Sequence, residues 1–227
     1  MYFDRQPVFM RKLFLCFFIC SSLSALCQTN RVNISEFMKD LTATTTSGRH
    51  VQVVLWFPTQ YWQIMGNNMK LDQQVINDLQ ERMNNYIIVA LADGQVMDGG
   101  FVHFSLKTDV AASLFIVDSA GKQYRPEDET DLPDKVLSVA SALKPVFSNL
   151  LGALGEGTNL YFFKLKNPND QNLVDAEKRG KFTVSFNGIN NTYNLPLPSL
   201  LPPKFCPVDN ARMNGNWNYC PIHGNKL

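Results

Sequence analysis

The dipeptide Asn187-Gly188, placed between two stretches of strand-forming residues, is the strongest local constraint on how this chain folds. Residues 181–186 and 189–195 contain the β-branched and aromatic residues that favour strands. Asn and Gly accept the positive φ angles of a type I′ turn, so the two stretches are predicted to form a tight hairpin. Strands joined by such turns are antiparallel. The sequence therefore predicts an antiparallel sheet.

Further apolar stretches, several of them bounded by Pro or Gly, continue this pattern along the chain. They are residues 51–57, 86–91, 101–106, 114–117, 122–125 and 160–163. With the hairpin they make about eight strands joined mostly by tight turns. We therefore expect a mainly β fold, an antiparallel and immunoglobulin-like β-sandwich formed by residues 28–198.

Two segments show the 3.6-residue period of an amphipathic helix instead of a strand pattern. The shorter covers residues 71–83, and the longer begins after Pro133 and carries its apolar stripe to Leu154. Pro145 is expected to kink the longer helix or to end its first half. The prediction is a sandwich with two inserted helices, the longer one packed against a sheet.

Charge is balanced along the 227 residues, with 21 Lys and Arg against 20 Asp and Glu and a net charge of +1. Such a chain has no strong overall field to attract nucleic acid or an anionic membrane surface. We therefore expect no nucleic-acid partner, and any partner must be recognised through local features.

The first 27 residues have the pattern of a secretory signal peptide. A short basic segment, residues 10–12, precedes an apolar stretch from Leu13 to Leu26, and small residues at 25 and 27 predict cleavage before Gln28. The apolar stretch is shorter than the roughly 20 residues that a membrane-spanning helix needs, so no integral span is expected. Translation starts at Met1 or Met10. The expected location is secreted or periplasmic.

Cys27 allows an alternative, in which the processed protein carries lipid on this residue. The bulky Leu26 before it disfavours that alternative, because lipoprotein signals resemble one another in having Gly, Ala or Ser there.

The tail, residues 205–227, contains two copies of one five-residue pattern. Residues 206–210 and 220–224 both read Cys, Pro, an aliphatic residue, a residue of metal-ligand type, and then Asn or Gly. A hairpin turn is predicted between them at residues 213–216. Asn210 and Gly224, which end the two copies, suit a backbone position with positive φ.

This duplicated pattern resembles a zinc ribbon, in which two Cys-Pro-x-Cys-Gly knuckles bring four ligands onto one tetrahedral ion. Asp209 and His223 stand where that pattern has its second and fourth Cys. The resemblance implies a structural Zn²⁺ held by Cys206, Asp209, Cys220 and His223, with no position open to a substrate. It covers the tail alone, which a Pro-rich connector of residues 199–204 joins to the preceding domain.

Two alternatives to zinc remain open at this point. Cys206 and Cys220 are the cysteines left after signal cleavage, and in an oxidising compartment they could form a disulfide that closes the same tail. The duplicated pattern could also be a site that holds nothing.

Two classes of function agree with these features. The preferred one is an exported, non-catalytic structural or interaction module of unknown specific role, with another envelope protein or a polysaccharide as its partner. The alternative is an envelope-polymer hydrolase that uses carboxylates such as Asp93 and Asp98, or a carbohydrate-binding protein that uses the aromatic residues at 56–62. No acid and base pair can be argued for the hydrolase, which is why the non-catalytic module is preferred. His50 and His103 lack metal-ligand spacing and are expected to be ordinary histidines.

Overall fold

The computed structural model describes residues 32–227. The predicted signal peptide and the lipidation alternative at Cys27 lie outside the described residues. Of the described residues, 31% are in strands and 32% in helices, so the fold is mixed rather than mainly β. Within residues 32–227, no helix combines the length and the apolar character needed to cross a membrane.

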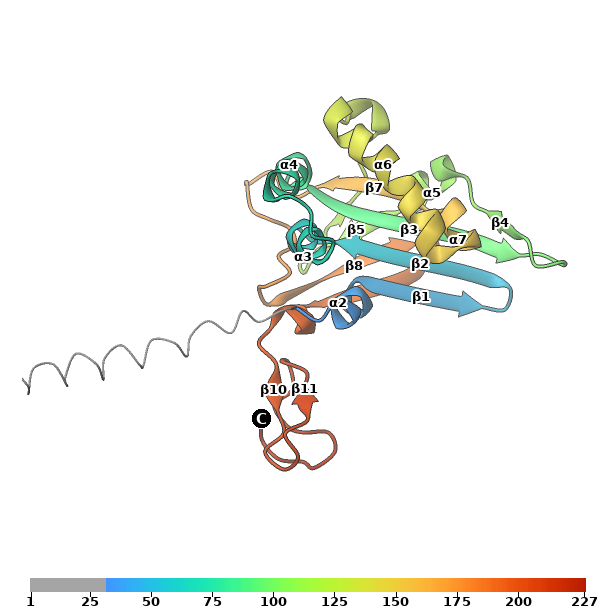
Figure 1. Ribbon diagram of the computed structural model, residues 1–227. Helices are drawn as coiled ribbons and strands as arrows, with labels where there is room; N and C mark the ends of the chain where they lie inside the picture. The colour runs from blue at the N-terminus through green and yellow to red at the C-terminus, as the bar shows by residue number, and fades with distance from the viewer. Residues whose placement is uncertain (1–31) are drawn as a thin grey trace, which may run out of the picture. The chain divides into compact units, whose positions relative to one another are not determined.

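The larger sheet has five antiparallel strands and is organised around its longest strand (Figure 1). Its strands are β1 (Thr42–Ser47), β2 (His50–Phe57), β3 (Tyr86–Val96), β4 (Val102–Phe104) and β7 (Asn159–Lys164). β3 pairs with β2, and also with β7 near its beginning and with β4 near its end. β1 was not predicted, because its Thr-rich sequence is largely exposed and lacks an apolar pattern.

The smaller sheet has four antiparallel strands in the order β6-β5-β8-β9. They are β5 (Phe115–Val117), β6 (Gln123–Tyr124), β8 (Gly180–Phe186) and β9 (Ile189–Leu195). Asn187 and Gly188 have φ angles of 48° and 78°, and Phe186 pairs with Ile189 across them. The predicted two-residue hairpin is confirmed.

Residues 32–227 contain six α-helices, not the two that the sequence predicts. They are α2 (Ile34–Leu41), α3 (Gln60–Asn68), α4 (Gln73–Met83), α5 (Lys107–Ser113), α6 (Asp134–Leu151) and α7 (Ala153–Glu156), and 3-10 turns occur at η1 (Glu129–Asp131) and η2 (Pro198–Leu200). The two predicted helices correspond to α4 and to α6 with α7. Pro145 lies inside α6, which continues to Leu151.

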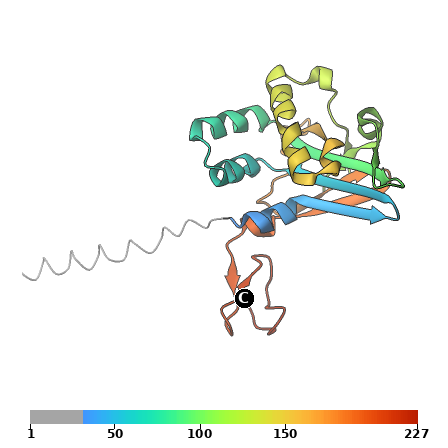
Figure 2. The ribbon, with the colours of Figure 1, turned by 45° about the vertical axis from the view of Figure 1, so that its right-hand side comes forward.

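Neighbouring residues of β2 show how the layers pack. The Trp56 ring contacts the smaller sheet, with its centroid 4.6 Å from that of Phe182 and 5.5 Å from that of Tyr193. The next residue, Phe57, points to the opposite face, where its ring lies 6.0 Å from Phe147 of α6. The inner strands β2 and β3 of the larger sheet are therefore buried on both faces over most of their length, with the smaller sheet on one side and helices on the other (Figure 2). Face-to-face antiparallel sheets are present, but an immunoglobulin-like arrangement is not confirmed.

The tail has a small hydrophobic cluster separate from the main core. Its short strands β10 (Lys204–Phe205) and β11 (Arg212–Met213) pair with each other. The hairpin thus closes around the first Cys pattern. At the place of the predicted hairpin turn, residues 213–216, a turn does form, with the N–H of Trp217 donating to the carbonyl of Asn214 at 3.1 Å, but the paired strands of the tail do not flank it. The side chains buried in the tail are those of Cys206, Met213 and Cys220, with Ala211 and Leu227 packed against them.

Candidate metal centre

The first Cys pattern folds into a compact turn held by two backbone hydrogen bonds. The N–H of Cys206 donates to the carbonyl of Ala211 at 2.9 Å, and the N–H of Asn210 donates to the carbonyl of Cys206 at 2.9 Å. Asn210 has a φ of 56°, in the left-handed region that short polar residues tolerate. The turn brings the residues after Cys206 back towards its sulfur.

The second Cys pattern forms the same turn with the same hydrogen-bond spacing. The N–H of Cys220 donates to the carbonyl of Asn225 at 2.7 Å, and that of Gly224 donates to the carbonyl of Cys220 at 2.8 Å. Gly224 has a φ of 69°. The sequence duplication is therefore a structural duplication, and the positive φ expected at Asn210 and Gly224 is confirmed. We call these two turns the knuckles.

Three donor atoms from the two knuckles converge. The Nδ1 atom of His223 lies 3.3 Å from the Sγ of Cys206 and 3.7 Å from the Sγ of Cys220. The sulfur atoms of Cys206 and Cys220 lie 3.5 Å apart, and the three donor atoms are all within 4.8 Å of one another. Bonds of about 2.3 Å to sulfur and about 2.0 Å to nitrogen place tetrahedral donors about 3.5–3.8 Å apart. The observed separations fit a triangular face of such a site.

The two cysteines are not joined by a disulfide. Both thiols are free, and their separation of 3.5 Å is far longer than the S–S bond of about 2.05 Å. This structure therefore holds the cysteines at the spacing of two ligands on one ion, and the disulfide alternative is not formed in it.

The surroundings of the two thiols favour one thiolate. Burial raises the pKa of Cys220, but backbone N–H groups of His223 and Ile222, together with the Cys206 side chain, outweigh burial and lower this pKa to about 7. The N–H of His223 lies 3.4 Å from the Cys220 sulfur. Burial raises the pKa of Cys206 despite similar backbone contacts. A thiolate is the form that binds metal, so Cys220 is prepared for ligation.

Asp209 lies beside the three-donor group. Its Oδ2 atom is 4.0 Å from the Nδ1 of His223, while its Oδ1 accepts a hydrogen bond from the N–H of Ala211 at 3.0 Å. That N–H and the Cys206 side chain hold the pKa of Asp209 below its usual value. The Asp209 carboxylate is thus placed next to the site, although the compact donor group comprises only Cys206, Cys220 and His223.

The two carboxylates considered for a hydrolase lie in different environments. The Asp93 side chain is only 4% exposed, and it accepts hydrogen bonds from the Nε2 of His50 at 2.8 Å and the Oγ of Ser105 at 2.6 Å. Asp98 is 89% exposed and pairs with Arg49 at 2.7 Å. Asp93 is a buried carboxylate whose hydrogen bonds are satisfied, and His50 is its partner. The sequence could not reveal that Asp93, His50 and Ser105 are in contact, because they come from separate segments of the chain.

The aromatic cluster considered for sugar binding belongs largely to the core. Trp56, Phe57 and Trp62 are buried, and the Phe57 and Trp62 rings stack with centroids 6.0 Å apart. Buried rings offer no face on which a sugar could stack.

Comparisons with known proteins add little to this geometry. No protein family matches the chain, and no curated protein matches its sequence. Among solved structures, the chain is similar to a DUF4426 family protein from Pseudomonas aeruginosa PAO1 at 12% identity, over 68% of this chain and 91% of that chain, with a TM-score of 0.28. At that TM-score the two folds are not shown to be the same.

Proposed function

We propose that the protein is an exported, non-catalytic structural or interaction module whose tail folds around one structural Zn²⁺. The convergence of Cys206, Cys220 and His223 carries this proposal. Two sulfurs and an imidazole nitrogen are ligands that zinc prefers, and Mg²⁺ or Ca²⁺ would require oxygen. Export is part of the proposal because the first 27 residues have the pattern of a signal peptide.

Asp209 is proposed as the fourth ligand. It occupies the place in the first knuckle that His223 occupies in the second, and its Oδ2 already lies 4.0 Å from the His223 nitrogen. Four protein ligands leave no position for a substrate or a reactive water, and this is the usual composition of a structural zinc site. The donor set therefore supports a structural role for the ion.

Exposed apolar side chains around the knuckles support an interaction role. Each knuckle presents one such residue just before its Cys and another two positions after it: Phe205, Val208, Tyr219 and Ile222, which are 52%, 59%, 63% and 71% exposed. Grouped exposed apolar residues are typical of protein contact sites. Phe205 and Tyr219 have rings that a sugar could stack on, but Val208 and Ile222 between them can neither stack on a sugar nor donate hydrogen bonds to one, so we assign this surface to another envelope protein rather than to a polysaccharide.

Metal analysis of the purified protein tests the structural part of the proposal. One zinc per chain is expected, and Cys220→Ser should lose it, whereas His103→Ala should retain it as a matched control for histidine replacement. A chain purified without metal that does not take up added Zn²⁺ would contradict the proposal.

Cobalt substitution distinguishes a structural site from a catalytic one. The Co²⁺-loaded protein should show a tetrahedral thiolate spectrum that added azide does not change, because every ligand position is filled. In Asp209→Ala, azide should enter the vacated position and change the spectrum. A wild-type spectrum that responds to azide would show an open site and would contradict the non-catalytic role.

The interaction role is tested by cross-linking in the producing cells. A protein adduct is expected on the wild type and should be lost in Ile222→Asp, while zinc content stays unchanged. Asp170→Ala, in an exposed loop away from the knuckles, is the control and should retain the adduct. Equal adducts in all three proteins would remove the knuckle surface from the proposal.

A further inference from the structure

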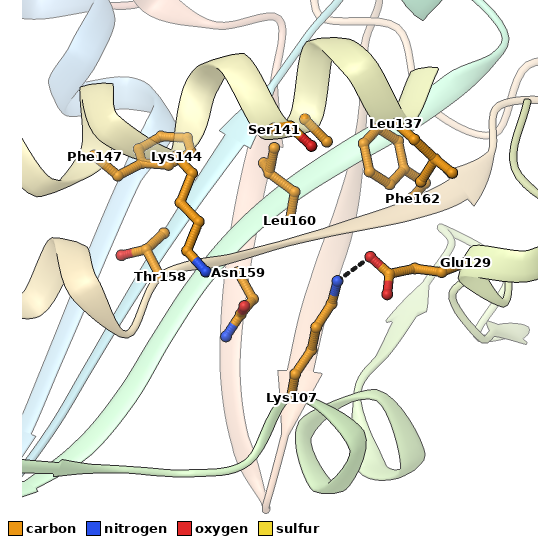
Figure 3. Close-up of a pocket in the computed structure, with 11 residues that line it drawn as sticks. Lys107, Glu129, Leu137, Ser141, Lys144, Phe147, Thr158, Asn159, Leu160 and Phe162 are labelled. Carbon is orange, nitrogen blue, oxygen red and sulfur yellow. Dashed lines mark hydrogen bonds and ion pairs between the residues drawn. The ribbon is translucent and has the colours of Figure 1, made fainter. Parts of the chain in front are cut away.

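A pocket outside the tail lies between α6, β7 and the segments around α5 and η1 (Figure 3). Its volume is about 370 Å³, which is within the range of small-molecule sites. Helix and strand both supply apolar walls: Leu137, Ala140 and Phe147 from α6, and Leu160 and Phe162 from β7. An apolar surface of this kind accommodates the hydrocarbon part of a ligand.

Two lysines approach the pocket from opposite sides, as Figure 3 shows. Lys107 pairs with the carboxylate of Glu129. Lys144 extends from α6 towards Asn159, and within residues 32–227 its ammonium group has no hydrogen bond or ion pair. Two ammonium groups and one carboxylate leave the pocket with one unmatched positive charge.

We propose that this pocket binds a small amphipathic monoanion, a carboxylate with an apolar body. The carboxylate pairs with Lys144, and the apolar body lies on the wall formed by α6 and β7. The hydroxyl of Ser141, one turn before Lys144 on the same helix, also lines the pocket and adds a polar group to the α6 wall.

The charge of the pocket limits the class of ligand further. Glu129 sits at the end of the pocket opposite Lys144 and is neutralised by Lys107, so Lys144 alone is left to balance a ligand's charge, which disfavours phosphate esters and nucleotides with two or more negative charges. A cationic ligand would meet the ammonium group of Lys144. A single negative charge next to an apolar body is the combination that both ends of the pocket accept.

Decanoate is the probe for the test, with decanol as an uncharged molecule of the same chain length. Binding is followed by chemical-shift changes in ¹⁵N spectra of the zinc-loaded protein. Decanoate should shift residues of α6 and β7 and saturate. Lys144→Met should weaken decanoate binding by about tenfold, the value of one charge-assisted hydrogen bond, and should leave decanol binding unchanged.

Two further variants make the result specific to Lys144. Lys135→Met removes a lysine from the same helix outside the pocket and should bind decanoate as the wild type does. Lys144→Glu should reject decanoate and bind decyltrimethylammonium instead. The proposal is overturned if decanoate causes no saturable shifts, if the shifts lie outside α6 and β7, or if Lys144→Met binds decanoate as tightly as the wild type.

Discussion

The body, residues 32–198, and the tail, residues 205–227, are stabilised in different ways. The body buries large side chains in one core that includes Phe57, Phe163 and Val184. The tail buries only Cys206, Met213 and Cys220. Ordering each residue costs about 1–2 kcal/mol of backbone entropy, which three buried side chains cannot offset. Apolar burial is therefore sufficient for the body, and the tail needs an additional source of stability such as a metal ion.

The body and the tail also differ in how far their aromatic side chains are exposed. Trp56, Phe57 and Phe163 are buried in the body, although its Phe101 is exposed, whereas Phe205, Trp217 and Tyr219 of the small tail are all exposed. A segment folded by a metal does not have to bury its aromatic residues. Such side chains remain free to contact a partner.

Metal removal should separate the two regions most clearly. Structural Zn²⁺ contributes about 10–16 kcal/mol to the folding of zinc-finger peptides, so chelation should unfold the tail and leave the body folded. Amide hydrogen exchange measures both regions at once: the N–H groups of Cys206 and Cys220 should lose protection, while that of Val184 keeps it. Protection of the tail amides in metal-free protein would show that the tail folds without the ion.

Phe163→Ala should produce the reverse pattern. Phe163 is fully buried on β7, which pairs with β3, and removing such a ring costs about 3–5 kcal/mol. The free energy of unfolding of the body should fall by that amount in a denaturant titration, with one zinc still bound at low denaturant. Val146→Ala, at an exposed position on α6, is the control and should change stability little. Loss of zinc from the folded Phe163→Ala protein would mean that the tail depends on the body.

Within the tail, the two non-cysteine ligands should contribute unequally. The Nδ1 atom of His223 lies within 3.7 Å of both sulfurs, whereas Asp209 has one oxygen engaged by the N–H of Ala211. His223→Ala should weaken zinc binding by about 100-fold, and Asp209→Ala by about tenfold, in competition with a chelator. Equal losses would indicate that Asp209 moves fully onto the ion when the metal binds.

The sequence predicted the local features of the molecule better than the distant contacts. The Asn187-Gly188 hairpin and the two knuckles depend on residues within a few positions of one another, so their patterns are visible in the sequence. Each knuckle is a local turn, so the ligands it supplies were visible in the sequence, and three of the four predicted ligands form one compact donor group where the two knuckles meet.

Features that depend on tertiary contacts could not be predicted in this way. β1 is a Thr-rich strand that is recognised only by its pairing with β2. The hydrogen bonds of Asp93 to His50 and Ser105 join three separate segments, and the Lys144 pocket needs α6 to be placed over β7. In the tail, β10 and β11 pair on either side of the first knuckle and make it the end of a hairpin. The spacing of the two Cys patterns did not indicate this pairing.

The smallest expected effect concerns the response of the body to acid, through Asp118 at the turn between β5 and β6. Burial raises the pKa of Asp118, but backbone N–H groups of Lys122 and Ala120, each 2.9 Å from Oδ1, and the hydroxyl of Tyr124 outweigh burial, so this pKa is lowered. A carboxylate whose pKa is lower in the folded than in the unfolded state stabilises the fold above its unfolded pKa of about 3.9. That contribution is lost as the pH falls through the folded pKa.

Asp118→Asn should therefore be less stable than the wild type at neutral pH by about 1 kcal/mol or less, because solvent screens this accessible group. The difference should shrink below pH 4 and vanish at lower pH, when the wild-type carboxylate is protonated as well. Urea titrations of both proteins between pH 7 and pH 2 measure it. Asp128→Asn, which removes no side-chain hydrogen bond or ion pair recorded within residues 32–227, should match the wild type throughout. A stability difference for Asp118→Asn that stays constant down to pH 2 would mean that the protonated acid of Asp118 supports the turn as well as the carboxylate does, so that ionisation adds nothing.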